Sequence, residues 1–271
     1  MEHLGRSPML LLMMLAFVLG EIVWRTRIAR RGYNMRGAFA SLVLGVGNVL
    51  FGGAQAVVLA ALFLAAAKLA PVHWSMGDWK TWVGGFFAVE FAYYVFHRAS
   101  HRVRWIWASH AVHHSPEEMT FLSAIRLGWT NLLSGGWLFQ LPLVLAGFDP
   151  RLVFGLLAFN LHFQFFLHTE SVGRLGPLEW VLNTPAHHRV HHASNPEYLD
   201  CNYGSSLIVF DRLFGSFVAL RDDIDIRYGL TTPVLSHNPV RIAFNEWLAL
   251  ARDVRAASGW RARVRVMFGP P

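Results

Sequence analysis

The chain has 271 residues, 54% of them hydrophobic, and its mean hydropathy is +0.35. This composition is too apolar for an ordinary soluble domain and favours a membrane protein of one domain or two small ones. The formal net charge of +7 comes largely from residues at the ends of apolar stretches, which favours contact with lipid headgroups and excludes a nucleic-acid partner. The single cysteine, Cys201, excludes an intramolecular disulfide and a cysteine-based zinc site.

The first apolar stretch predicts a membrane anchor. Residues 8–24 are apolar except for Glu21, and no small-residue cleavage site of a signal peptide follows them. Five arginines lie within residues 25–36. Because basic residues next to a span are retained in the cytoplasm, we expect an uncleaved helix whose C-terminal end faces the cytoplasm.

Four further apolar stretches follow, at residues 38–70, 82–96, 129–148 and 152–167. The first is long enough to contain a break, and residues 149–151 leave almost no loop between the last two, which therefore read as a helical hairpin. We predict four to six membrane-embedded helices. An even number of crossings would bring His97 and His168 to the cytoplasmic side.

The fold expected is therefore all-α: an integral-membrane helical bundle with a cytoplasmic, histidine-rich helical cap. We place membrane helices in residues 1–80, a histidine-rich domain in residues 81–220 and a cytoplasmic C-terminal tail in residues 221–271. Residues 211–215 are typical of a helix end with a glycine cap, and one helix is predicted near residues 240–255.

Histidines are the main chemical signal. Of 14 in the chain, 11 lie between His97 and His192. They form one HxxxH motif, starting at His97, and two HxxHH motifs, starting at His110 and His188. Residues three and four apart share a helix face, so we expect the histidines of each motif to point the same way.

Neutral imidazole is a common metal ligand, and the motifs supply more ligands than one ion takes. With the histidine that follows the last apolar stretch, we predict ligands for two metal ions at His97, His101, His110, His113, His114, His168, His188, His191 and His192. His187 is either a further ligand or a structural residue. Glu170 either orients a ligand imidazole or is a carboxylate at a helix end. We assign no catalytic residue beyond the ligands and no cofactor-binding residue.

The pattern disfavours several kinds of metal site. The HExxH motif of zinc metalloproteases is absent, and a haem would use only one or two of the imidazoles. A transporter would place its ligands at mid-bilayer, whereas these lie at the ends of apolar stretches. Two nitrogen-ligated iron ions at a membrane face suit dioxygen activation against a lipid carbon. The alternative is a non-catalytic, histidine-rich metal-binding membrane protein, either a transporter or a metal sensor.

The chain resembles the fatty acid hydroxylase / sterol desaturase superfamily of integral-membrane di-iron enzymes. Its signature of HxxxH, HxxHH and HxxHH is complete and in order within residues 90–217. Residues 168–170, 175–179, 183–192, 202–204 and 211–215 look especially like a branch that cleaves ether lipids.

This resemblance implies a membrane-bound non-haem di-iron oxidoreductase that hydroxylates or desaturates a lipid with dioxygen. The substrate class is an ether lipid, a sterol or a fatty-acyl lipid, and the cofactors are two iron ions cycling between Fe²⁺ and Fe³⁺, held in a catalytic domain at residues 81–220. Electrons come from a separate donor, with tetrahydrobiopterin suggested by the resemblance alone. The expected location is a bacterial inner membrane, crossed several times, with the histidines facing the cytoplasm. The lipid, the reductant and the oligomeric state are left open.

Overall fold

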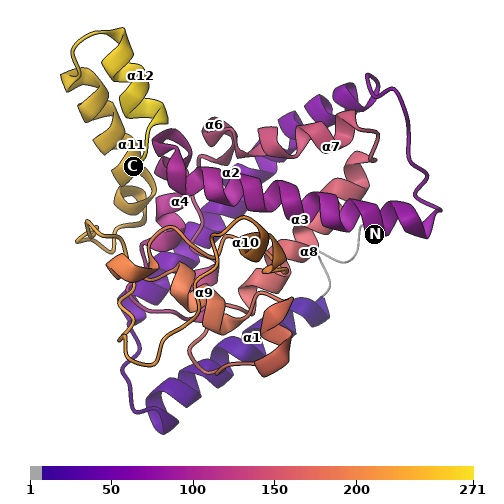
Figure 1. The fold of residues 1–271 in the computed structure, drawn as a ribbon. Helices are drawn as coiled ribbons and strands as arrows, with labels where there is room; N and C mark the ends of the chain where they lie inside the picture. The colour runs from indigo at the N-terminus through magenta and orange to yellow at the C-terminus, as the bar shows by residue number, and fades with distance from the viewer. Residues whose placement is uncertain (1–7) are drawn as a thin grey trace.

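The computed structural model describes residues 8–271 and is all-helical, as expected (Figure 1). Besides helices, this part of the chain contains only two isolated β-bridges. The α-helices are α1 (Pro8–Val23), α2 (Met35–Ala67), α3 (Trp79–Arg102), α4 (Arg104–His114), α5 (Phe121–Ala124), α6 (Asn131–Ser134), α7 (Leu141–Leu145), α8 (Pro150–Phe165), α9 (Pro185–His191), α10 (Val209–Leu213), α11 (Pro239–Ala256) and α12 (Trp260–Phe268). A π-helix, η2 (Trp24–Ile28), continues α1, and three 3₁₀ helices are η3 (Gly136–Phe139), η4 (Gly176–Trp180) and η5 (Pro196–Tyr198).

Two helices within residues 8–271 are long and apolar enough to cross a membrane. The first is α1 with η2, 21 residues, and the second is α2, 33 residues. Most of their apolar side chains face outward: Val49 of α2 is 74% exposed and Val57 is 71% exposed. An apolar surface of this size needs a lipid environment, so the two helices indicate that the protein associates with a membrane.

The prediction of four to six membrane-embedded helices is therefore wrong by this criterion. α8 has only 16 residues, and α3 carries buried polar side chains along its 24 residues. The apolar stretch at residues 129–148 is divided into α6, η3 and α7, because Gly135 adopts a left-handed conformation (φ 76°) that ends α6. Composition does not show such a break.

The long stretch at residues 38–70, in contrast, contains no break before it ends, because α2 runs continuously to Ala67. Gly47 of α2 lies against Trp129, and a Cβ at this position would be 2.4 Å from the indole Nε1. That nitrogen donates a hydrogen bond to the carbonyl of Leu44 at 3.0 Å. Glycine is therefore required here for the close approach of a neighbouring segment and not for a bend.

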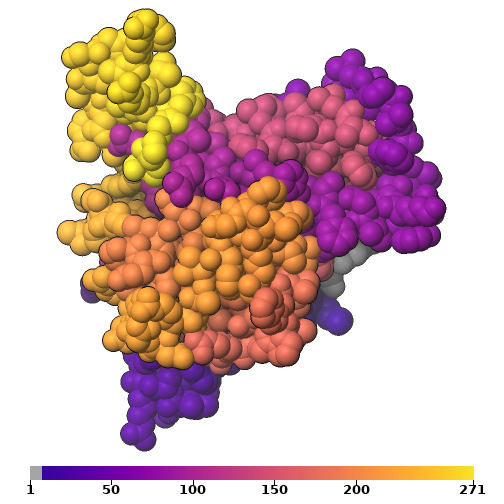
Figure 2. Space-filling view, in the orientation of Figure 1, coloured from indigo at the N-terminus to yellow at the C-terminus, as the bar shows by residue number. Residues whose placement is uncertain are grey.

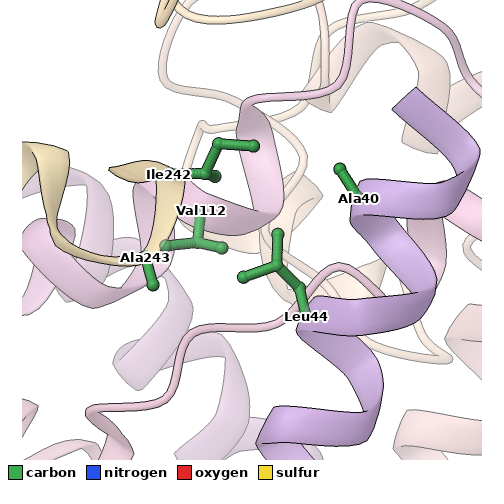
Figure 3. Packing of buried hydrophobic residues seen from close by; sticks show 5 residues of the cluster. All are labelled: Ala40, Leu44, Val112, Ile242 and Ala243. Carbon is green, nitrogen blue, oxygen red and sulfur yellow. The ribbon is translucent and has the colours of Figure 1, made fainter. Parts of the chain in front are cut away.

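The C-terminal segment packs against the bundle. Ile242 and Ala243 of α11 form a buried cluster with Ala40 and Leu44 of α2 and with Val112 of α4 (Figure 3). This confirms the helix predicted near residues 240–255, and it shows that this part of the expected tail belongs to the core. The helix end predicted at residues 211–215 is confirmed too, since Gly215 follows α10 with φ 70°.

Candidate metal centre

The nine predicted ligands lie together in two groups. We call them the five-histidine group (His97, His101, His110, His114 and His191) and the four-histidine group (His113, His168, His188 and His192). Within each group the candidate ligand nitrogens are all within 4.8 Å of one another. Eight of the nine rings are buried and His110 is half-buried. Four segments separated in the sequence, α3, α4, the end of α8 and α9, bring these side chains together.

Each HxxHH motif divides between the two groups, so its histidines do not all point the same way. On α4, His110 and His114 belong to the five-histidine group and His113 to the four-histidine group. At α9 the division is reversed, because only His191 belongs to the five-histidine group. Positions i+3 and i+4 differ by about 100° around a helix axis, so adjacent histidines face different groups.

Backbone carbonyls orient four of the rings. The Nδ1 atoms of these rings lie 2.7 to 3.3 Å from carbonyl oxygens, in the pairs His97–Tyr203, His113–Arg126, His168–Gln164 and His191–Cys201. A carbonyl oxygen only accepts, so Nδ1 must carry the proton in each case. A neutral ring protonated at Nδ1 presents a bare lone pair at Nε2, which is the arrangement that metal-binding histidines adopt.

These lone pairs face one another. The Nε2 atoms of His113 and His168 are 3.1 Å apart, and neither ring can donate a hydrogen bond from that atom. Two lone pairs at this distance repel unless a cation lies near both. Other buried ring nitrogens, the Nε2 atoms of His101, His191 and His192, have no hydrogen-bond partner among the described residues. The donor set therefore fits metal ions.

Burial keeps these rings neutral. Desolvation lowers the pKa of all nine histidines, and it is the largest cause for each of them. The pKa is about 4 for His113 and for His191. Near neutral pH, the rings are therefore deprotonated and ready to coordinate a metal without first losing a proton.

Sequence reasoning missed the turn that supplies two of the carbonyls. The carboxylate of Asp211 accepts hydrogen bonds from the amides of Tyr203 (2.8 Å) and Gly204 (2.7 Å). A Cβ on Gly204 would lie 2.1 Å from the carbonyl oxygen of Leu207, so only glycine fits. Burial raises the pKa of Asp211 to about 6. The turn thus holds the carbonyls of Cys201 and Tyr203 against the five-histidine group.

His187 and Glu170 lie outside both groups. The Nε2 of His187 is 3.9 Å from the carboxylate of Glu179. Glu170 receives a hydrogen bond from Arg25 Nη1 at 2.6 Å and another from the hydroxyl of Tyr228 at 3.3 Å. Its contacts in residues 8–271 thus join η2 to the segment after His168, and a bond to a ligand imidazole, one of the two alternatives for Glu170, is not among them.

A cavity of about 640 Å³ reaches the histidines from outside. His101, His114 and His191 of the five-histidine group line it, as does His192 of the four-histidine group. The opposite wall belongs to α11, and the lining is half polar and half apolar in character. The cavity is within the size range of small-molecule sites, so an amphipathic molecule has access to both groups.

Comparisons with a family model and with known proteins agree on one family. The model of the family described as fatty acid hydroxylase matches residues 82–216, which contain all nine histidines. Alkylglycerol monooxygenase of Homo sapiens is 40% identical over 192 residues, covering 70% of this chain and 42% of that protein. The Xenopus tropicalis alkylglycerol monooxygenase is 38% identical over 205 residues, covering 75% of this chain and 44% of that protein.

A bacterial protein also matches. The ornithine lipid hydroxylase of Rhizobium tropici is 31% identical over 133 residues, covering 49% of this chain and 40% of that protein. The chain thus spans less than half the length of the curated relatives it matches. No solved structure matches it significantly. On the family match, the histidine signature and these relatives, the chain belongs to the fatty acid hydroxylase family.

Proposed function

We propose that the protein is a membrane-bound non-haem di-iron oxidoreductase that hydroxylates a lipid with dioxygen. The nine histidines of the two groups are its iron ligands. The observation that carries the proposal is the pair of bare Nε2 atoms, on His113 and His168, that face each other at 3.1 Å beside a second group of the same kind. Two bound irons would supply the oxidising power that an unactivated C–H bond requires.

The side chains and the backbone have separate tasks in this proposal. The Nε2 atoms bind the metals, and the carbonyls of the turn at residues 201–204 fix the ring orientations. The cavity of about 640 Å³ admits the substrate and the external electron donor. The names of the relatives favour an alkylglycerol or an ornithine lipid as the first substrates to test.

A contact of Arg25 supports a proposal for the location of the site. This residue belongs to the basic cluster of residues 25–36, and its guanidinium bonds to Glu170, two residues after His168. This contact supports a metal centre on the same side of the membrane as the basic cluster. Since such clusters stay on the cytoplasmic side, we propose that the histidines face the cytoplasm of a bacterial inner membrane. Within the chain, residues 81–220 form the catalytic unit, preceded by the membrane helices of residues 1–80 and followed by residues 221–271.

Metal content and product analysis test the function together. Purified protein should hold about two irons per chain, because nine nitrogens exceed the roughly four to six ligands that one ion takes. With a reductant, ¹⁸O₂ and an alkylglycerol or ornithine lipid, one labelled oxygen should enter the product. His168→Ala should abolish the reaction. His162→Ala is the matched control, because His162 lies on α8 but outside both groups.

Two results would contradict the proposal. One is stoichiometric zinc in a protein that cleaves an ester or amide. The other is bound metal without dioxygen consumption in the presence of any of these lipids, combined with metal transport or a metal-dependent response. That second result would favour the non-catalytic alternative.

A further inference from the structure

The last helix, α12, presents an apolar face that nothing in the described chain covers. Trp260, Val264 and Phe268 are four residues apart in turn and lie on one side of the helix. They are 70%, 42% and 57% exposed. Three large apolar side chains on one helix face, left uncovered in this way, indicate an apolar partner.

Arginines border this face on both sides. At 100° per residue, Arg261 and Arg265 flank it on one side and Arg263 on the other. The helix has no acidic residue, and none of the three arginines forms an ion pair within residues 8–271. An apolar strip flanked by unpaired basic residues is typical of a helix that lies in the headgroup layer of an anionic membrane.

The position of α12 is consistent with such a surface. The α11–α12 pair stands out from the body of the molecule in Figure 2, and the exposed fractions of Trp260, Val264 and Phe268 show that the face is accessible.

The face continues into an apolar groove. Phe268 lines a groove of about 770 Å³ together with residues of α3, α4, α6, η3 and α7, among them Trp105 and Leu138. Phe268 and Trp105 stack with their ring centroids 6.4 Å apart. The lining of the groove is almost entirely apolar, and none of the nine histidines contributes to it. The groove is therefore separate from the cavity that reaches the metal centre.

We propose that α12 and this groove together bind an anionic membrane phospholipid. The arginines of α12 hold its phosphate headgroup, and one of its hydrocarbon chains lies in the groove. The charge favours an anionic over a zwitterionic lipid, and the groove accounts for the uncovered Phe268. This binding site does not depend on the proposed oxidation.

Native mass spectrometry of the purified full chain, with phosphatidylglycerol and phosphatidylcholine of the same chains, tests the proposal. Wild-type protein should retain phosphatidylglycerol preferentially. The triple variant Arg261→Gln, Arg263→Gln and Arg265→Gln should lose that preference. Its affinity for phosphatidylglycerol should fall roughly fivefold for each arginine removed. Leu138→Trp, which fills the groove, should weaken retention of both lipids.

A charge-matched control separates the site from net charge. The variant Arg174→Gln, Arg221→Gln and Arg227→Gln removes three exposed arginines elsewhere and should keep the preference. Equal retention of the two lipids by the wild type would overturn the proposal. So would a triple α12 variant that binds phosphatidylglycerol as the wild type does, or a control that loses the preference equally.

Discussion

The lowered pKa of His113 predicts a stability effect that depends on pH. In the metal-free protein, this ring has a pKa of about 4 in the folded state, against about 6.5 in an unfolded chain. As the pH falls, the unfolded chain takes up a proton first. The stability associated with the neutral ring is therefore complete above about pH 6.5 and is lost as the pH falls toward 4.

The size of the effect follows from the two pKa values. At pH 5 an unfolded histidine is almost fully protonated while the folded ring is mostly neutral, which costs the folded state about 2 kcal/mol relative to pH 7.5. In a protein of this size, about 2 kcal/mol corresponds to roughly 4–8 °C in melting temperature. His113→Asn removes the titrating group, so the variant does not suffer this loss.

The assay compares wild type and His113→Asn after removal of metal with a chelator, by thermal unfolding in detergent at pH 7.5 and pH 5. The variant is expected to be the less stable protein at pH 7.5. The difference in free energy of unfolding between the two proteins should be smaller by about 2 kcal/mol at pH 5. Carboxylates such as Asp211, whose raised pKa acts in the opposite direction, cancel in the comparison. An equal gap at both pH values would refute the reasoning, since His113 would then titrate as in the unfolded chain.

Three substitutions test the surroundings of the two histidine groups. Gly204→Ala should destabilise the protein by about 1–3 kcal/mol and reduce its iron content, because the new Cβ would lie 2.1 Å from the carbonyl oxygen of Leu207. Glu21→Gln should lower the iron content, measured by elemental analysis, toward half. The carboxylate of Glu21 accepts a hydrogen bond from the hydroxyl of Thr169 at 2.5 Å, and the amide of glutamine offers only one acceptor oxygen. His187→Gln should leave the iron content unchanged, because this residue belongs to neither group.

Gly204→Ala and Glu21→Gln each have a matched control. Gly155→Ala adds a methyl group on α8 where no atom lies within 4 Å, so it should leave iron content intact. Phe17→Leu trims a contact with Phe121, 5.7 Å between ring centroids, and should lower stability without loss of iron. If Gly204→Ala retained iron as fully as Gly155→Ala, the turn would not orient the ligands. Iron loss in His187→Gln would show that the two groups are incompletely defined.

The gathering of the histidines could be predicted because its signal is local. Histidines at three- and four-residue spacing lie near one another on any helix, and eight of the nine histidines that the structure gathers were chosen on this basis. The glycine after α10 also follows from short-range sequence features, whereas the apolar composition of residues 38–70 left open whether α2 would contain a break. His168 needed one long-range assumption, that the last apolar stretch ends on the side of the motifs.

The features of the site that could not be predicted from the sequence depend on tertiary packing. The division of each HxxHH motif between the groups depends on how α4 and α9 are rotated about their axes, which composition does not specify. The backbone carbonyls of Cys201 and Tyr203 are invisible in a search for functional side chains. In the sequence, Glu21 is an isolated acidic residue in an apolar stretch. In the structure it is the one buried residue of α1, and its carboxylate accepts a hydrogen bond from the backbone amide of Phe121.

The divided motifs favour one two-metal centre over two independent metal sites. Because α4 and α9 each supply ligands to both groups, a displacement of either helix would disturb both. The groups also touch directly, since the rings of His114 and His192 stack with centroids 4.3 Å apart and planes at 19°. Two sites on separate helices could shift relative to each other as a substrate binds. Here the same two helices fix both groups, so the metals they hold would keep a constant separation, as a reaction shared between two ions requires.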